Sequence, residues 1–358
     1  MRGRRLNLLT IAGLALLGAC GRTEIGPAQY SHEQCRRVEL VDAVSGELLV
    51  GAEDFAVDAS SGRLFLSSYD RRAVEKAARK GEKTLPEGGV YKVSLDTIFS
   101  AASRVEVTPL VAAGEIAGGL RPHGISYDAA NHELVFINRS YGRANRRWKM
   151  EPHLQRIGAN GEMFVAEKGS APCAANDVLV TDRATYTSFD HSACNWRAGF
   201  EDLFNLRRAG IADEDGAPLY ERAAFANGLA RTTSGGVALA ATRQNEIVFL
   251  KEQSGGLAET ARIETPGGPD NLTVSYDGGV IAAVHPSLYR LALNRKHGVG
   301  KAPSRIVKAD SDTGSLEILF DDPSGKLFSA ATVAVETREG LIVGSVTDKG
   351  VLVCGEAL

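Results

Sequence analysis

The sequence predicts an all-β fold, a six-bladed β-propeller, on the strength of three observations. Short runs of Val, Ile, Leu, Phe and Tyr recur along the chain and are bounded by Gly, Asp, Asn and Ser, which is typical of strands. The runs come in pairs joined by tight turns. Six such modules of roughly fifty residues, the size of a four-stranded blade, fill the chain from Cys35 to Cys354. A β-sandwich would not be expected to repeat similar strand pairs at this period.

The strand pairs follow one another in chain order, and further strands complete the blades. The first strand after Cys35, residues 36–41, is expected to join the C-terminal strands, so that both termini close in one blade and no sheet edge stays exposed. The predicted pairs are 53–58 with 63–68, 123–128 with 133–138, 176–181 with 184–190, 236–242 with 246–251, 271–276 with 279–285, and 331–336 with 341–346, and the further strands are 89–95, 304–309, 314–320 and 350–354.

Two short helical insertions interrupt this pattern. Residues 70–83 are charged and helix-prone, and we expect a solvated excursion on the rim. Residues 195–222 carry apolar residues at the spacing of an amphipathic helix, which we expect to pack on the body of the propeller; a lid over one face is the alternative. These apolar residues are Trp196, Phe200, Leu203, Phe204 and Leu206.

The N-terminus reads as an export signal. A basic start and an apolar run from Leu8 to Leu17 precede Leu-Gly-Ala-Cys, which matches a bacterial lipobox with Cys20 as the acylated residue. An ordinary signal cleaved nearby is the alternative. We therefore expect a signal over 1–19, a lipidated tether over 20–34 and the propeller over 35–358. Gly21 after the cysteine favours the outer membrane, with the protein facing the periplasm.

Composition limits the partners. The chain of 358 residues is 44% hydrophobic, enough for a sizeable core, and has a formal net charge of −3. Its basic patches are short and scattered, so we expect no nucleic-acid binding. There is no Gly-x-Ser-x-Gly elbow, no His-Glu-x-x-His zinc motif, and no P-loop or Rossmann glycine fingerprint. The oligomeric state is not predicted.

Beyond Cys20, an even number of cysteines remains for an oxidising compartment. Four cysteines allow three pairings. A bond from Cys35 to Cys354 would fasten the termini together, and one from Cys173 to Cys194 would pin a loop beside a cluster of oxygen-bearing side chains. We expect both, with buried free thiols as the alternative.

Carboxylates and carboxamides recur at the starts of the predicted strands. Oxygen-rich side chains without a Cys or His triad suit a hard divalent cation, calcium above all. Taken singly, an Asx residue before a strand is more often a turn former, and Asn-Gly is a common turn dipeptide. Taken together, these clusters predict a metal site where remote segments converge: Glu53-Asp54, Asn176-Asp177, Asn227-Gly228 and Asp270-Asn271, with His123 among them.

Several ordered motifs carry a resemblance that runs through nearly the whole predicted propeller. They are Gly51-Ala52-Glu53-Asp54, Arg121-Pro122-His123-Gly124-Ile125-Ser126, Asn176-Asp177-Val178, Phe225-Ala226-Asn227-Gly228, Asp270-Asn271-Leu272-Thr273-Val274, His285-Pro286, Ala331-Thr332-Val333 and Leu341-Ile342-Val343-Gly344-Ser345. In this order and spacing they resemble the paraoxonase/arylesterase family, six-bladed calcium propellers related in architecture to gluconolactonases.

The resemblance implies two calcium ions. The first, at the pocket floor, would be held by Glu53, Asn176, Asn227, Asp270 and Asn271. The second, in the central tunnel, would be held by Asp54, Asp177 and the backbone carbonyl of Ile125. Neighbouring residues on a strand point in opposite directions, so one Glu-Asp or Asn-Asp pair can serve one ion above and one below. The upper calcium would polarise a carbonyl and stabilise an oxyanion.

The resemblance also gives His123 the role of general base, for which imidazole has a suitable ordinary pKa; a structural role is its alternative. Arg139, His191 and His285 are expected at the pocket rim. The family's second histidine after an Asn is replaced here by Arg139, which cannot relay a proton in the same way. Three alternatives to a two-histidine mechanism follow: His123 works alone, another group assists it, or the activity has changed or been lost.

The function implied is a calcium-dependent hydrolase of lactones or aryl esters, with a small-molecule ester or lactone as substrate and the membrane as a partner through Cys20. Two alternatives stay open. One is a non-catalytic calcium propeller that binds a ligand or partner on its top face, and the other is a sugar lactonase of the gluconolactonase kind.

Overall fold

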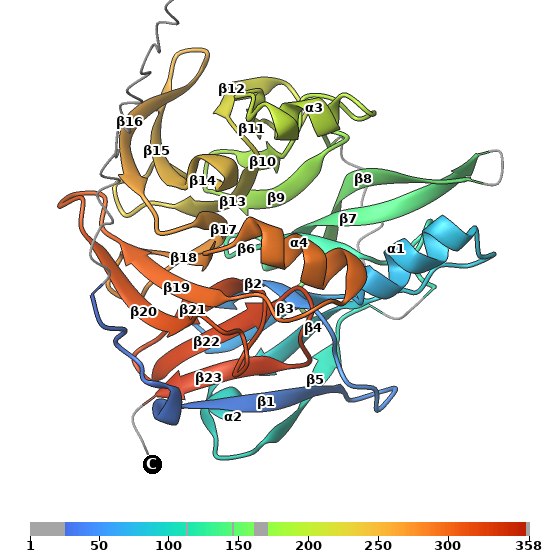
Figure 1. Cartoon of the computed structure of the whole chain (residues 1–358), viewed down its shortest axis with the longest axis vertical. Helices are drawn as coiled ribbons and strands as arrows, with labels where there is room; N and C mark the ends of the chain where they lie inside the picture. The colour runs from blue at the N-terminus through green and yellow to red at the C-terminus, as the bar shows by residue number, and fades with distance from the viewer. Residues whose placement is uncertain (1–25, 112–113, 145–146, 161–170, 356–358) are drawn as a thin grey trace, which may run out of the picture.

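Strands dominate the structure, a computed structural model that describes residues 26–111, 114–144, 147–160 and 171–355 (Figure 1). The predicted signal segment and Cys20 lie outside the described residues. Within these ranges the strands form five hydrogen-bonded sheets, one of them eight-stranded. None of the helices in these ranges is long and apolar enough to span a membrane.

Six inner strands form a closed ring around the centre of the molecule. Each contacts the next in chain order, and the last contacts the first. All six are almost fully buried, which explains their near-continuous runs of small and apolar residues. They are β2 (Ala52–Asp58), β6 (Pro122–Asp128), β9 (Ala175–Val180), β13 (Ala226–Arg231), β17 (Gly268–Val274) and β21 (Ala331–Glu336).

From each inner strand a sheet runs outward through antiparallel neighbours. The predicted strand pairs are confirmed; a strand was also expected at Asn227, but β13 was not among the predicted pairs. The outer strands are β3 (Arg63–Ser68), β4 (Gly89–Ser94) and β5 (Arg104–Pro109) beside β2; β7 (Glu133–Ala144) and β8 (Arg147–Gly158) beside β6; β10 (Thr185–Phe189), β11 (Ala209–Ala212) and β12 (Pro218–Ala223) beside β9; β14 (Val237–Ala241), β15 (Glu246–Gln253) and β16 (Gly256–Glu264) beside β13; β18 (Val280–His285), β19 (Ser304–Ala309) and β20 (Leu316–Asp322) beside β17; and β22 (Gly340–Ser345) and β23 (Val351–Gly355) beside β21.

Strand β1 (Cys35–Asp42) closes the molecule. It pairs antiparallel with β23, as predicted, with Cys35 opposite Cys354, and a disulfide joins the two residues. It also pairs in parallel with β5, which the sequence did not indicate. The first and last sheets therefore merge into one, and in Figure 1 the two ends of the folded chain lie side by side.

The hydrophobic core lies between neighbouring sheets. One cluster between the first and last sheets includes Phe55, Leu64, Val107 and Ile342, all buried. Burying a side chain of this size contributes about 1.5–3 kcal/mol. Other clusters join neighbouring sheets in the same way, so packing holds the ring of inner strands in place.

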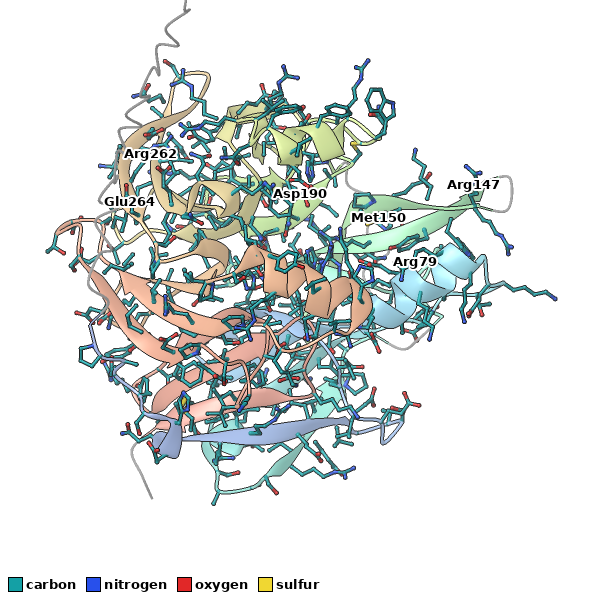
Figure 2. All side chains as sticks on the ribbon, in the orientation of Figure 1. Arg79, Arg147, Met150, Asp190, Arg262 and Glu264 are labelled. Atoms are coloured by element: carbon teal, nitrogen blue, oxygen red, sulfur yellow. A yellow bond between two sulfur atoms is a disulfide. The ribbon has the colours of Figure 1, made fainter. Side chains whose placement is uncertain are left out.

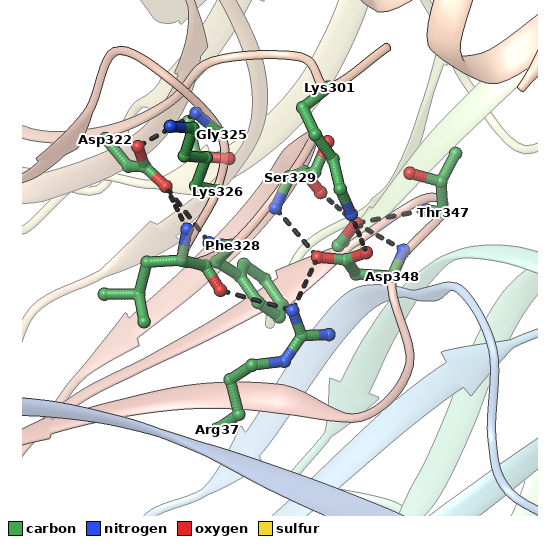
Figure 3. Close-up of polar contacts among 12 residues, drawn as sticks. Arg37, Lys301, Asp322, Gly325, Lys326, Phe328, Ser329, Thr347 and Asp348 are labelled. Atoms are coloured by element: carbon green, nitrogen blue, oxygen red, sulfur yellow. Dashed lines mark hydrogen bonds and ion pairs between the residues drawn. The ribbon is translucent and has the colours of Figure 1, made fainter. Parts of the chain in front are cut away.

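A polar network supports the loop that precedes β2 (Figure 3). The carboxylate of Asp348 accepts the backbone N–H of Ser329 at 2.9 Å and lies 3.3 Å from Arg37 and 3.4 Å from Lys301. The backbone carbonyl of Asp348 accepts the N–H of Gly51 at 3.0 Å. The network thus connects β1 and the last sheet to the start of β2.

Four α-helices are described, where two helical insertions were predicted. Helix α1 (Arg71–Lys80) confirms the first; Asp70 caps its N-terminus and Gly81 ends it in the left-handed conformation. Helices α2 (Leu95–Phe99) and α4 (Leu288–His297) were not predicted. Figure 1 shows α4 lying across the middle of the molecule with α1 beside its end and α3 above it. The two 3₁₀ turns are His32–Gln34 and Thr242–Gln244.

The second predicted helical insertion is wrong in extent. Only α3 (Ala198–Leu203) forms in residues 195–222, and β11 and β12 follow it. Asn205 adopts the left-handed conformation, with a φ of 50°, and ends the helical path. The expected packing on the body is also wrong, because the apolar stripe is exposed: Trp196 by 71%, Phe200 by 49%, Leu203 by 73% and Phe204 by 63%.

Candidate active site

A polar cavity of about 340 Å³ lies at the starts of the inner strands. Every inner strand contributes a polar side chain from its second or third residue, and further lining residues come from the 3₁₀ turn η2 (Thr242–Gln244) and from α1, α3 and α4. We call this space the polar cavity. Its strand residues are Glu53, His123, Asn176, Asn227, Asp270 and Thr332.

The backbone re-aims these side chains at the same position in every inner strand. Each strand has a shift in its register with its neighbour at or beside the cavity residue. Such a bulge turns a side chain out of the regular alternation. Neighbouring inner strands also approach closely here, since a Cβ on Gly228 would lie 2.4 Å from the backbone nitrogen of Leu272. A glycine after Asn227 is therefore required.

The carboxamides point their oxygens away from protein partners. Nδ2 of Asn271 donates to the backbone carbonyl of Glu53 at 2.9 Å, Nδ2 of Asn227 donates to Asp270, and Nδ2 of Asn176 lies 3.5 Å from Asp190. The three Oδ1 atoms are buried without a hydrogen-bond partner. Buried polar atoms are normally paired, so these unpaired oxygens fit a cation ligand set.

The carboxylate of Glu53 fits the same set. Its Oε2 lies 2.8 Å from Nδ1 of His123, yet the two atoms are not aligned as a hydrogen bond. Burial raises the pKa of Glu53, but His123 and Arg139 outweigh burial and hold it below its usual value. The carboxylate is therefore ionised. No three His, Cys, Asp or Glu side chains gather as a metal site in the described ranges, so the ligand set here depends on carboxamides.

His123 is almost completely buried, with 2% of its surface exposed. Burial and then the positive charge of Arg139 lower the pKa of His123 to about 4. The ring is therefore neutral at pH 7, and it can accept a proton although it is a weaker base than free imidazole. Arg139 does not line the cavity; it is 3% exposed, and its Nε has no hydrogen-bond partner.

Two carboxyl groups meet on the other side of the cavity floor. Asp54 accepts the N–H of Ile125 at 2.8 Å, and Asp177 accepts the N–H of Leu229 at 2.6 Å. Burial and then the charge of Asp177 raise the pKa of Asp54 well above its usual range, and burial raises the pKa of Asp177 to about 8. Two buried carboxyl groups held together fit a second cation, which would offset their repulsion.

His191 and His285 both line the polar cavity and both contact aspartates. Nε2 of His285 lies 2.7 Å from Oδ2 of Asp270. Nδ1 of His191 lies 2.7 Å from Asp190, and its Nε2 lies 3.2 Å from Asp202 on α3. Burial alone would lower the pKa of His191, but the two aspartates raise it to about 10. Figure 2 shows Asp190 in the upper middle of the view, with Arg262 and Glu264 to its left.

A disulfide joins Cys173, just before β9, to Cys194, just before α3. It therefore links the strand that carries Asn176 to the segment that carries Asp202.

Several lining residues were not predicted from the sequence. Thr332 is the second residue of β21, and its hydroxyl donates to the backbone carbonyl of Glu53 at 2.8 Å. Thr332 occupies the same strand position as the Asx residues of other inner strands, and this equivalence could have indicated it from the sequence. The remaining residues lie on helices and loops that no strand pattern places: Arg71, Asp190, Asp202, Arg243, Arg295 and Lys296.

A second, larger cavity of about 820 Å³ lies at the other ends of the same strands. We call it the apolar cavity because apolar atoms make up most of its lining. Ile125, Leu229 and Leu272 line it, each two residues beyond a position of the polar cavity. Asp54 and Asp177 fall between the two sets along the strands.

Comparisons with known proteins agree on the fold. No protein-family model matches the chain, and no curated protein matches it in sequence. A structure provisionally described as a gluconolactonase is 15% identical with a TM-score of 0.51, over 94% of this chain and 97% of the other. A PQQ-bound aldose sugar dehydrogenase from Streptomyces coelicolor is 12% identical with a TM-score of 0.51, over 92% and 99%.

A protein of unknown function from Bacteroides thetaiotaomicron is 8% identical with a TM-score of 0.52, over 90% of this chain and 75% of the other. At these identities the likeness shows the fold alone. The chain is a mostly β protein with the fold of the β-propellers that it resembles, and membership of the paraoxonase family is not shown.

Proposed function

We propose that this six-bladed propeller is a calcium-dependent hydrolase of lactones or aryl esters. One observation carries the proposal: the inner strands bring a buried carboxylate, unpaired carboxamide oxygens and one neutral histidine into a single cavity. Such a convergence of oxygen ligands beside a proton acceptor suits hydrolysis of a carbonyl compound at a hard cation.

Two ligand sets fit calcium in this proposal. Glu53, Asn176, Asn227, Asp270 and Asn271 would hold the ion at the cavity, and Asp54, Asp177 and the carbonyl of Ile125 would hold the buried one. Bound at the cavity, calcium supplies Lewis-acid polarisation of the substrate carbonyl.

The residues of the chain would do the rest. The neutral ring of His123 would accept a proton from water, and the carboxylate of Glu53, 2.8 Å away, would stabilise the charge that the ring then carries. Water adds to the acyl carbon, the bond from this carbon to the ester oxygen breaks, and the proton passes to that oxygen. A lactone thereby opens to a hydroxy acid. Burial of the cavity walls limits competing solvent around the reacting carbon.

One observation favours the non-catalytic alternative. The charge of Arg139 helps to hold the pKa of His123 at about 4, which weakens the base. A calcium propeller that binds a ligand without turnover would have no need of a stronger one. The sugar-lactonase alternative keeps the same chemistry and is favoured by the many charged side chains around the cavity.

The test combines metal content with turnover. Initial rates would be measured on lipophilic lactones, D-gluconolactone and phenyl acetate, with calcium and with a chelator. We expect chelator-sensitive turnover, and a fall in kcat of about 10²–10⁴-fold in His123→Gln with calcium still bound. Bound calcium without turnover on any of these substrates would instead establish the non-catalytic alternative.

Location is part of the proposal. We propose that Cys20 carries a lipid and that the protein is anchored in the outer membrane, facing the periplasm. Mass spectrometry of the mature N-terminus, and fractionation of Cys20→Ser, would test both points.

A further inference from the structure

The polar cavity has a basic side formed by two helices that are remote in sequence. Arg71 is the first residue of α1, and Arg295 lies in the last turn of α4. The helices contact each other, and both guanidinium groups line the cavity together with Glu53 and His123. Each of these arginine side chains is 22% exposed. The basic side is therefore sheltered but open to a ligand.

The positive charges here exceed the negative ones. Oε1 of Glu75 serves both arginines, at 3.3 Å from Nε of Arg71 and 3.4 Å from Nη1 of Arg295. The positive charge of Arg71, and then burial, lower the pKa of Arg295 to about 10. The two guanidinium groups are thus close enough to repel each other, and one carboxylate is shared between them.

Arg139 adds a third positive charge behind this side. It acts electrostatically on Arg295, Glu53 and His123, and the structure gives its side chain no ion pair within the described ranges. Removing a buried charge from water is costly unless a counter-charge lies near. Arg139 acts electrostatically on Glu53, but in the proposed function the charge of Glu53 is taken up by calcium.

Two other cations of the cavity are balanced differently. Arg243 lies 3.5 Å from Asp202, and the charged ring of His191 lies between Asp190 and Asp202. These cations have carboxylates of their own. The ion pairs of the structure therefore leave the surplus positive charge on the cavity residues of α1 and α4.

Resting on the proposed function, we infer that Arg71 and Arg295 bind a carboxylate of the substrate, so that the preferred lactones carry a free anionic group away from the reacting carbonyl. Guanidinium groups bind carboxylates through paired, charge-assisted N–H donors. Within the described part of the chain, the Nη groups of Arg71 have no hydrogen-bond partner in the structure and remain free to donate.

A matched pair of lactones tests this directly. D-Glucaro-1,4-lactone carries a carboxylate where D-glucono-1,4-lactone carries a neutral hydroxymethyl group. We expect kcat/KM of the wild type to be higher for the charged lactone. Arg295→Gln should lower kcat/KM about 10- to 100-fold for the charged lactone, the worth of a charge-assisted hydrogen bond, and less than about 2-fold for the neutral one.

Two further variants make the result secure. Arg71→Gln should repeat the selective loss, so the test survives if one variant folds poorly. Lys76→Gln is the matched control, because it removes a positive charge from the exposed face of α1 outside the cavity. Equal losses on both lactones would mean that the arginines act on the reacting carbonyl, and no loss on either would mean that they bind no substrate. Either result overturns the inference.

A binding measurement separates this inference from the proposed function. D-Glucuronate and D-glucose have no ester bond, and calorimetry with the calcium-loaded protein would compare them. If glucuronate binds more tightly than glucose and Arg295→Gln removes the difference, the anion site stands even if no lactone is hydrolysed. If the wild type does not discriminate between the two, the anion site is refuted even if lactones are hydrolysed.

Discussion

The two ends of the inner strands have opposite character although they belong to the same six segments. At the polar cavity each strand presents a polar side chain beside a bulge; two residues further along, Ile125, Leu229 and Leu272 face the apolar cavity. The apolar cavity is larger, at about 820 Å³ against about 340 Å³. Among the described residues, every buried side-chain nitrogen or oxygen in the lining of the apolar cavity has a hydrogen-bond partner. The polar cavity has several such atoms without one.

Cavity volume is therefore a poor guide to the position of the candidate active site. A folded chain normally pairs its buried polar atoms, and unpaired ones are retained where a ligand will meet them. The strand starts concentrate these atoms, while the strand ends carry side chains that maintain packing between sheets. We therefore expect substitutions at the strand starts, in the polar cavity, to change metal binding and turnover. Substitutions at the strand ends, in the apolar cavity, should change stability.

The largest expected effect is that of Asp270→Ala at the polar cavity. Asp270 accepts from Asn227 and contacts His285, so its removal deletes a proposed ligand and loosens two neighbours. We expect calcium in the cavity to be lost and kcat/KM to fall at least about 10³-fold, as when a group acting in the transition state is removed. Calcium titration followed by calorimetry, alongside initial rates, measures both.

Val274→Ala is the control on the same strand, because Val274 lines the apolar cavity and is 39% exposed. Val274→Ala should keep both calcium binding and kcat/KM. If Asp270→Ala bound as much calcium as the wild type, the polar ends of the strands would not differ from the apolar ends in metal binding, and the prediction would be wrong.

Much of this arrangement could be predicted from the sequence, for identifiable reasons. Apolar runs bounded by turn residues predict strands, so β2 with β3 and β21 with β22 were placed correctly. Strand β13 was expected at Asn227 but given no partner, because Asn227-Gly228 favours a turn locally; pairing with β14 overrides that preference. Helix α4 had its own signals, Ser287 as N-cap and Gly298 after its end, but they stand between strong strand patterns.

The candidate site was predictable where it lies on strands and not where it lies on helices. Glu53 and Asn176 occupy equivalent positions on inner strands, so repetition indicates them. Arg71 and Arg295 meet only because α1 and α4 cross the same face, and no local pattern records a contact between such distant segments. For the same reason the burial of Arg139 behind the cavity could not be read from its position after Asn138.

An intermediate effect is expected for Leu229→Ala at the apolar end. Leu229 is 4% exposed and belongs to the cluster between the sheets of β9 and β13. Truncation should lower the free energy of unfolding by about 2–4 kcal/mol, which urea denaturation would measure. Its backbone N–H still donates to Asp177, so kcat/KM per folded molecule should stay within about 2-fold. A selective loss of turnover at unchanged stability would show that both ends serve the reaction.

The smallest expected effect is that of His191→Gln in the polar cavity, which concerns stability and its dependence on pH. Asp190 and Asp202 raise the folded-state pKa of His191 to about 10, above the ordinary value of about 6.5. A raised pKa means that the charged ring stabilises the folded state fully below pH 6.5 and that this contribution is lost as the pH rises through 10.

The variant should therefore be less stable than the wild type by about 1–2 kcal/mol at pH 6, the worth of a hydrogen bond to a charged group, and the gap should close above pH 10. Urea denaturation of both proteins at pH 6, 8 and 10.5 measures it, since other groups that titrate near pH 10 cancel in the difference. A gap independent of pH would mean that His191 contributes by packing against Phe225, whose ring lies 5.4 Å away edge-on, and not by its charge. The aspartates would then be free to serve a ligand instead of the histidine.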